Sequence, residues 1–228
     1  MSLHLSYRAA PGNPWFSWQY VRDNSDTILA ALREHTWLVA RAVLIAALVA
    51  LPLAVAAYWF RSLAGPVLAV SGVLYTIPSL ALFAFLGPTL GIGAVTVLTV
   101  VVLYALLVIV RNALAGLHQV PPDVLEAAEG MGYGRWARLV RIELPLALPG
   151  ILTGLRLATV STVALVTVGV VIGRGGLGQL IFAGFQNNFY KAQIMTGTVL
   201  CVLLALLLDL VLAGVGRLLT PWLRGRSS

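Results

Sequence analysis

The chain has 228 residues, of which 60% are hydrophobic and 10% are charged, and its formal net charge is +7. Soluble globular domains carry about 25% charged residues, so this composition excludes an ordinary soluble domain and indicates a membrane protein. The single cysteine excludes a disulfide framework and a cysteine-ligated zinc cluster. The positive charge comes mainly from arginine, which in a membrane chain favours contact with anionic lipid and an acidic cytoplasmic partner over nucleic acid.

Uncharged stretches predict five membrane-spanning helices. A helix needs about 20 residues to cross the hydrocarbon core of a bilayer, and charged side chains inside that core are costly. The uncharged run 62–110 is too long for one crossing, and we expect the Gly- and Pro-rich turn at 87–93 to divide it. The predicted spans are 37–60, 65–86, 93–111, 150–172 and 194–217, and the predicted fold class is an all-α polytopic membrane protein.

The predicted domain organisation is a membrane domain at 36–217 with short ends outside the bilayer. Residues 1–35 contain aromatic residues suited to a membrane interface, and Ser25–His35 has the apolar spacing of a short helix lying on the surface. No cleavable signal peptide is expected, because the first apolar stretch begins near residue 37. Residues 218–228 are predicted to form a basic cytoplasmic tail.

Lysine and arginine in the short loops predict which side of the membrane each loop faces. If the segment between the third and fourth spans is cytoplasmic, that side carries more of these residues. We therefore expect an outer N-terminus and a cytoplasmic C-terminus in an inner or plasma membrane. The cytoplasmic set is Arg61, Arg111, Arg135, Arg138, Arg141, Arg217, Arg224 and Arg226, and the outer set is Arg8, Arg22, Arg33, Arg41, Arg174 and Lys191.

The loop at 112–149, between the third and fourth spans, is charged and is predicted to face water. Asp123 followed by Glu126 resembles a capping box, which would start a short helix over 124–129. Glycines at 130, 132 and 134 permit a sharp reversal. A second helix is expected to run from Arg135 to Leu144 and to end at Pro145, so that a compact helix-turn-helix outside the bilayer joins two spans.

A motif inside this loop resembles the signature of the membrane subunits of ABC importers. It reads Glu-Ala-Ala, then glycine, then Ile-x-Leu-Pro, and every defined position is present with the family's spacing. The residues are Glu126, Ala127, Ala128, Gly132, Ile142, Leu144 and Pro145. A re-entrant or interfacial loop that holds these residues by chance is the alternative, which the number of spaced matches disfavours.

This resemblance implies that the loop forms a coupling helix that docks in a groove of a separate ATPase subunit. Glu126 would make a charge-assisted contact with the ATPase. The two alanines would keep the helix surface low enough for the groove, the glycine would make the turn, and the Ile-x-Leu-Pro residues would fix the second arm against the third and fourth spans.

The same resemblance implies several partners. The sequence has no GxxxxGK[ST] phosphate loop, so no catalytic or metal site is expected in this chain, and ATP and Mg would be bound by two copies of the partner ATPase. Five spans cannot enclose a pathway alone, which implies a dimer with an identical or paralogous permease chain. An extracytoplasmic substrate-binding protein would deliver the solute.

Further segments resemble the permeases of osmoprotectant importers, which carry glycine betaine, carnitine or choline. They are Thr76–Leu82, the turn at 86–93, Tyr104–Leu107 with Arg111 and Asn112, and Gly173–Gly178. The Thr-Ile-Pro-Ser part discriminates best, since Gly-Gly-Leu-Gly also occurs in methionine and sulfonate-type permeases. We therefore predict an osmoprotectant permease subunit, with a permease of the same architecture for methionine or another small nitrogenous solute as the alternative.

Aromatic residues in the second and third spans are candidates for lining the substrate path, because a quaternary ammonium is best held by aromatic faces. Simple packing is the alternative for each of them. The candidates are Tyr75, Phe83, Phe85 and Tyr104. A further set, Gly173, Gly175, Gly176 and Gly178, is a candidate external turn and gate hinge, with a plain loop as the alternative.

Ionisable residues near the spans have two interpretations. Asp209 lies in the last apolar run, where it would serve ion coupling or pair with a loop arginine near the cytoplasmic edge. Arg156 is expected to reach the inner surface or to bond the coupling loop, and His35 is expected at the membrane interface.

Two other classes of function fit less well. An intramembrane hydrolase would need a histidine inside a span, and no predicted span has one. A passive channel would have no use for the coupling loop.

Overall fold

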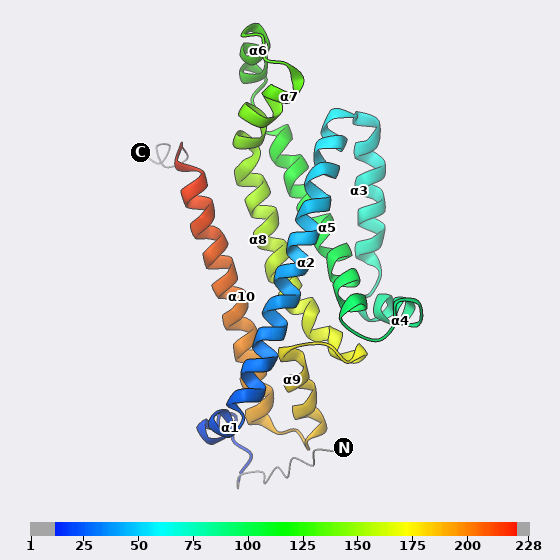
Figure 1. Cartoon of the computed structure of the whole chain (residues 1–228), viewed down its shortest axis with the longest axis vertical. Helices are drawn as coiled ribbons and strands as arrows, with labels where there is room; N and C mark the ends of the chain where they lie inside the picture. The colour runs from blue at the N-terminus through cyan, green and yellow to red at the C-terminus, as the bar shows by residue number, and fades with distance from the viewer. Residues whose placement is uncertain (1–11, 223–228) are drawn as a thin grey trace.

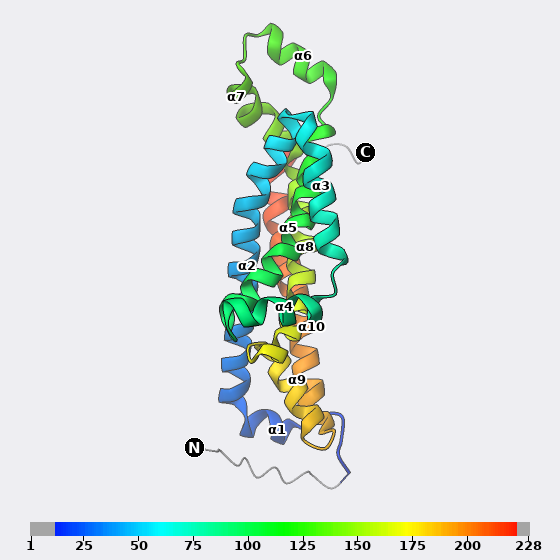
Figure 2. The same ribbon diagram turned by 90° about the vertical axis from the view of Figure 1, so that its right-hand side faces the viewer.

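The structure is a computed structural model that describes residues 12–222. In this range the chain is mostly helical, and its long helices lie side by side in one elongated bundle (Figures 1 and 2). Helix α6 lies beyond one end of the bundle, and helices α1 and α9 lie at the other end. Arg8, Arg224 and Arg226, which the orientation prediction used, lie outside the described residues.

The elements follow one another without any strand in the described range. In chain order they are α1 (Trp18–Asp23), α2 (Ser25–Trp59), α3 (Arg61–Thr76), α4 (Ser79–Leu90), α5 (Ala94–His118), α6 (Pro122–Gly130), α7 (Arg135–Arg138), the π-helical turn η1 (Leu139–Glu143), α8 (Leu144–Val168), the 3-10 turn η2 (Gly169–Ile172), α9 (Leu177–Gln186) and α10 (Lys191–Leu219).

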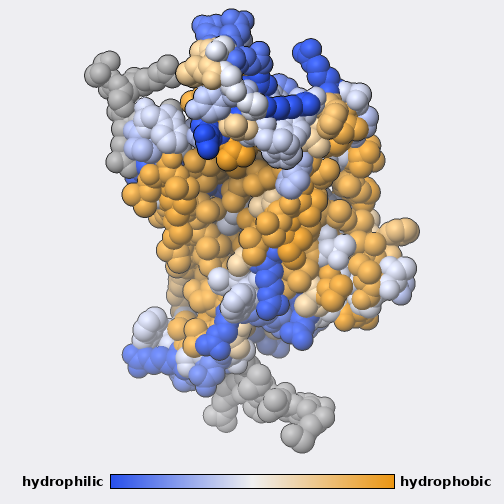
Figure 3. Space-filling view, turned by 45° about the horizontal axis from the view of Figure 1, so that its top comes forward, coloured by the Kyte–Doolittle hydropathy of each residue, from blue (hydrophilic) through white to orange (hydrophobic). Residues whose placement is uncertain are grey.

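Four helical stretches are long and apolar enough to cross a membrane, namely α2, α5, Arg135–Ile172 and α10. The bent pair α3 and α4 makes a fifth if it counts as one span. Figure 3 shows the corresponding surface, a band of hydrophobic side chains between two hydrophilic ends. The expected all-α membrane fold is confirmed.

Helix α5 is the centre of the bundle, and small residues let its neighbours approach closely. A Cβ on Gly150 of α8 would lie 2.8 Å from the Cα of Gly116 on α5. On the other side, α2 buries alanines at helical spacing, from Ala42 to Ala57. Between apolar helices in lipid, close van der Waals packing replaces the hydrophobic drive that operates in water.

The predicted second span at 65–86 is wrong as a single straight helix. The chain bends by 95° between α3 and α4, because Pro78 restricts the preceding residue, Ile77, to an extended conformation. The hydroxyl of Tyr104 donates a hydrogen bond to the carbonyl oxygen of Ile77, so the bend leaves that backbone group satisfied. The turn also falls later than expected: 87 and 88 remain helical, and the reversal occurs at 91–93.

The predicted surface helix over Ser25–His35 is also wrong. These residues form the first turns of α2, which continues without a break to Trp59. The expected boundary between residues 35 and 36 therefore lies inside a helix. The exposed aromatic side chains of Trp15, Phe16 and Trp18 precede this helix, so their interfacial role remains a prediction.

The second helix of the loop does not end at Pro145. Helical structure continues from Arg135 through η1 into α8. The amide of Leu144 donates to the carbonyl of Leu139, five residues back, and this wider turn accommodates a proline that offers no N–H and crowds the preceding turn.

An ion pair links α10 to α8 inside the apolar part of the bundle. Arg156 donates from Nε to one oxygen of Asp209 at 2.8 Å and from Nη2 to the other at 2.7 Å. Asp209 therefore pairs with an arginine of a neighbouring span and not with the loop arginine that was expected, and Arg156 bonds Asp209 and not the coupling loop. Whether Arg156 also reaches the inner membrane surface stays a prediction. The pair satisfies two charges that would be costly in lipid.

We expect Asp209→Asn to lower the thermal stability of the purified protein in detergent by several degrees, because Arg156 then keeps its charge without a carboxylate. The exchange Arg156→Asp with Asp209→Arg should regain much of the loss. Asp26→Asn, at an exposed acid in the first turn of α2, is the matched control. Melting followed by size-exclusion chromatography measures this, and an exchange variant no more stable than either single variant would contradict the pairing.

Candidate functional site

Helix α6 begins with two prolines and not with the predicted capping box. Pro121 is the N-cap and Pro122 the first helical residue, a position where the missing N–H costs nothing. Asp123 lies within the first turn and makes no side-chain cap, so the capping-box prediction is wrong. Its carboxylate still complements the positive end of the helix dipole.

Gly132 reverses the chain after α6. Its φ is +81°, a left-handed conformation that costs other residues roughly 1–2 kcal/mol. The amide of Gly132 donates to the carbonyl of Glu129 at 2.9 Å, and the amide of Tyr133 donates to that of Ala128 at 3.1 Å. This pair of bonds is a Schellman motif, so the glycine of the sequence motif is required by backbone conformation.

The Glu-Ala-Ala residues face in different directions. Glu126 and Ala127 are exposed, whereas Ala128 is fully buried within this chain. Met131, just after the helix, is 68% exposed. One face of α6 is therefore available to a partner, and it presents a carboxylate and apolar side chains, while Ala128 serves packing inside the loop.

Arg138 joins the two arms of the loop. Its guanidinium contacts Glu129 at the end of α6, and its Nε donates to Oε1 of Glu143 in η1 at 2.5 Å. Glu143 is fully buried, and its second oxygen, Oε2, has no hydrogen-bond partner in the described chain. The buried carboxylate thus depends on Arg138 for its charge compensation.

A second contact fixes the loop to the corner between α2 and α3. Arg135 donates from Nη2 to the carbonyl of Trp59 at 3.2 Å and lies 4.7 Å from the centre of the Trp59 ring. Trp136 packs edge-on against the same ring at 4.5 Å. These contacts of Trp59 with Arg135 and Trp136 were not predicted from the sequence, although Trp59 and Phe60 stand next to each other immediately before Arg61.

The Ile-x-Leu-Pro residues lie where the loop enters the bundle. Leu144 packs against a core cluster formed by residues of α2, α5 and α8, including Leu114 and Leu117. Ile142 and Pro145 are half-buried beside it. The arrangement fits the expected role of fixing the second arm, which stays a prediction.

The aromatic candidates for the substrate path fall into different environments. Phe83 is fully buried in the core and Phe85 is exposed. Tyr104 is mostly buried, and its ring packs edge-on at 5.6 Å against Tyr75. Tyr75 lines a pocket with a volume of about 350 Å³.

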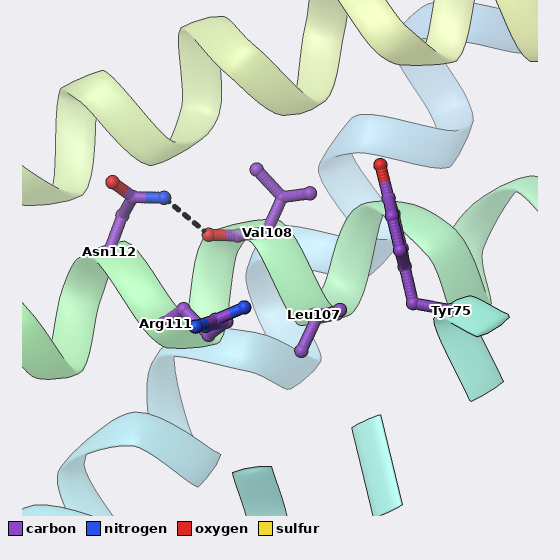
Figure 4. A pocket seen from close by; sticks show the side chains of 5 residues that line it. All are labelled: Tyr75, Leu107, Val108, Arg111 and Asn112. Atoms are coloured by element: carbon purple, nitrogen blue, oxygen red, sulfur yellow. Dashed lines mark hydrogen bonds between the residues drawn. The ribbon is translucent and has the colours of Figure 1, made fainter. Parts of the chain in front are cut away.

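This pocket lies along α5 beside the end of α3 (Figure 4). Its other lining residues are Leu107, Val108, Arg111 and Asn112. Figure 4 shows Arg111 and Leu107 leaving α5 on a different side from Val108 and Asn112. The side-chain amide of Asn112 donates to the carbonyl of Val108 at 2.8 Å. Of the Arg-Asn pair noted in the sequence, Arg111 is therefore the residue that brings a charge to the pocket.

The glycines at 173–178 form a closely packed loop. A Cβ on Gly176 would lie 2.6 Å from the Cβ of His35, and Arg174 pairs with Glu34 at 3.3 Å. These contacts hold the loop against α2 and favour the plain-loop interpretation over a hinge, which remains a prediction.

The side chain of His35, on α2, is fully buried within the protein, and its expected depth at the membrane interface stays a prediction. Its Nε2 lies 3.1 Å from the carbonyl oxygen of Val163, and its Nδ1 accepts from the amide of Leu177 at 3.3 Å. Both ring nitrogens are engaged with backbone groups, an arrangement that links three segments and does not resemble a hydrolase site.

We expect Arg138→Met to destabilise the closed loop by about 3 kcal/mol, because a buried carboxylate loses its partner. Hydrogen exchange of the amides at 135–143 should then accelerate about 100-fold. Adding Glu143→Leu should restore most of the protection, since an apolar pair replaces the broken ion pair. Equal exchange in the single and double variants would show that the ion pair does not hold the loop.

Comparison with known proteins agrees with the motif. Residues 42–225 match the family described as the binding-protein-dependent transport system inner membrane component. The chain is 39% identical to the osmoprotectant import permease OsmW of Salmonella typhimurium strain LT2 over 207 residues, which cover 89% of this chain and 96% of that protein. It is 36% identical to the glycine betaine/carnitine/choline permease OpuCB of Bacillus subtilis strain 168, over 89% of this chain and 93% of that one.

The fold is that of a solved transporter as well. A chain of the methionine ABC transporter MetNI, in an inward-facing conformation, superposes with a TM-score of 0.76 at 21% identity, covering 87% of this chain and 98% of the other. At this identity the likeness concerns the fold alone. The family match spans most of the chain, and the protein is a member of the family of inner-membrane components of binding-protein-dependent transport systems.

Proposed function

We propose that this chain is the permease subunit of an ATP-driven importer that takes up osmoprotectants of the quaternary amine class. The observation that carries the proposal is the loop between α5 and α8, in which α6 lies beyond the end of the bundle (Figure 2). The side chains of Glu126 and Ala127 on this helix are exposed. Glycine betaine, carnitine and choline are the solutes named for relatives that match over 89% of this chain. Methionine is a less well supported substrate, because the similarity to a methionine transporter is to a solved structure whose chain is only 21% identical.

The exposed face of α6 fits a docking role toward a separate ATPase. A carboxylate beside small and flexible apolar side chains suits a groove with a basic rim, where charge-assisted bonds set the register. ATP and Mg would be bound by that partner, in two copies, since the permease needs only to receive its movement. Ala127 alone of the two alanines faces outward, so it is the one that contacts the groove.

The connections of the loop explain how movement of α6 would reach the membrane helices. Val120 and Pro121 lead back directly to α5, and η1 leads forward into α8 without a break. Arg138 bridges the two arms, and Arg135 with Trp136 holds the α2–α3 corner. A push on α6 is therefore delivered to several spans together.

A second permease chain and a substrate-binding protein complete the proposed assembly. Apolar side chains along α10, such as Leu206, Leu210 and Leu218, are exposed on the single chain, as expected for surfaces that face lipid or another permease. The solute would pass between the two permeases after delivery from the outer side.

Uptake in a deletion strain tests the function. We expect the wild-type gene, with its ATPase and binding protein, to restore uptake of labelled glycine betaine or choline and not of methionine. Glu126→Lys and Gly132→Pro should each abolish this uptake while the protein stays in the membrane. Glu126 makes no bond within the described chain, so its reversal removes a partner contact, and proline cannot adopt the φ of Gly132 or supply its N–H.

Gly130→Ala is the matched control for the turn. Gly130 has open space at its Cβ position and no positive φ, so uptake should stay close to wild type. Restoration of methionine uptake alone would overturn the substrate class and leave the mechanism standing. Normal uptake in both Glu126→Lys and Gly132→Pro would show that the loop is not the coupling site.

Orientation is tested by cysteine labelling in a Cys201→Ala background, since Cys201 is the only native cysteine. Met131→Cys in the loop and Phe189→Cys near the opposite end of the bundle are both well exposed, at 68% and 62% in the native residues. We expect a membrane-impermeant maleimide added to intact cells to label position 189 and to miss position 131 until the cells are opened. The reverse pattern would place the loop outside and exclude an ATPase contact there.

A further inference from the structure

Arg111 is a charged side chain on α5, two helical turns from the loop end of the bundle, and it has no partner among the described residues. It is exposed on α5 and lines the pocket beside Tyr75. Within residues 12–222 it makes no hydrogen bond and no ion pair, whereas Arg156, Arg138 and Arg174 all have carboxylate partners. An unpaired charge of this kind calls for an anion supplied from outside the chain.

The pocket lies at membrane depth. Arg111 precedes His118, the last residue of α5, by two helical turns, about 10 Å along the axis. Tyr58 and His118 pack together at the end of the bundle that carries the loop, with ring centres 5.5 Å apart. Tyr75 lies about 21 Å along α3 from Arg61 at that same end. Both residues therefore fall within a hydrocarbon layer about 30 Å thick. Arg111 thus lies inside α5 and not in the cytoplasmic loop where the orientation prediction counted it.

The side chains around the pocket leave two free recognition groups. The hydroxyl of Tyr104 already donates to the carbonyl of Ile77, and the ring of Tyr104 packs edge-on against the ring of Tyr75. The side-chain amide of Asn112 already donates to the carbonyl of Val108. What remains is the half-exposed aromatic ring of Tyr75 and the guanidinium of Arg111, in a pocket of about 350 Å³, a size within the range of small-molecule sites.

These two groups match the two ends of a small zwitterion. A guanidinium binds a carboxylate through paired, charge-assisted hydrogen bonds. An aromatic face attracts a quaternary ammonium, which cannot donate hydrogen bonds. A cation without a carboxylate gains only the second interaction and is repelled by the arginine.

We propose that Arg111 and Tyr75 form a transport subsite for quaternary amines that carry a carboxylate, with the carboxylate at Arg111 and the ammonium on the Tyr75 ring. The inference rests on the proposed function and narrows it, because it makes glycine betaine and carnitine better substrates of this membrane step than choline. Arg111 acts by neutralising the substrate's negative end inside the membrane, where water is scarce.

The test uses the complete transporter, with its ATPase and binding protein, reconstituted in liposomes. ATP-driven uptake of labelled glycine betaine and of labelled choline is measured in parallel for each variant. We expect Arg111→Gln to reduce betaine uptake at least tenfold while choline uptake equals or exceeds the wild-type value. Arg111→Lys, which keeps the charge, should retain betaine uptake within about threefold. Tyr75→Leu should reduce uptake of every quaternary amine that the wild type carries, and Tyr75→Phe should not.

Arg61→Gln is the matched control, since Arg61 is an exposed arginine at the end of the bundle and its loss should leave the ratio of betaine to choline uptake unchanged. Dimer size and basal ATP hydrolysis of each variant report whether the assembly is intact. Loss of dimer in Arg111→Gln would overturn the subsite and assign the arginine to an ion pair with the second permease chain. Equal loss of betaine and choline uptake, or unchanged betaine uptake, would also overturn it. A wild-type transporter that carries neither solute would instead refute the proposed function.

Discussion

The constraint on which this fold depends is that polar groups inside an apolar bundle must find partners within the chain, because lipid offers none. Arg156 and Asp209 neutralise each other between α8 and α10. The ring of His35 joins α2 to backbone groups of α8 and α9. Tyr104 satisfies the carbonyl that the α3–α4 bend releases. Each of these contacts ties together segments far apart in sequence, so satisfying the polar groups also fixes the packing of the helices.

The same constraint acts in the loop between α5 and α8, at one end of the bundle. Glu143 is buried and held by Arg138, which also reaches Glu129 across the turn. Because the buried carboxylate fixes Arg138, and Arg138 fixes the end of α6, the position of the helix is set by an interior contact. The two alanines of the motif then have different roles. Ala128 is buried and packs inside the loop, whereas Ala127 is exposed on the face of α6 that is free to contact a partner.

The sequence predicted the helical class, the loop and its motif, because long uncharged runs and spaced motif residues are local signals. It did not predict which prolines would bend the chain. Pro52, Pro66, Pro88 and Pro149 all lie inside helices, whereas Pro78 separates two of them by 95°. The difference lies in the surroundings of each proline, such as the hydroxyl that Tyr104 supplies, and not in the dipeptides themselves. The partner of Asp209 and the burial of His35 could not be predicted from the sequence for the same reason, since both depend on contacts between helices.

Arg111 is informative because, unlike Arg156, it has no carboxylate partner among the described residues. A charge that only stabilised the bundle would be expected beside a carboxylate of its own chain, as Arg156 is. Arg111 is instead exposed at a pocket beside the ring of Tyr75. A charge at membrane depth without a partner costs stability, and an anionic group of the solute would offset that cost. For a transporter, a site completed only when the solute is present has a further consequence. The free energy of neutralising the arginine is gained as the solute enters and must be given back on release, so the carboxylate of the solute strengthens its binding inside the membrane.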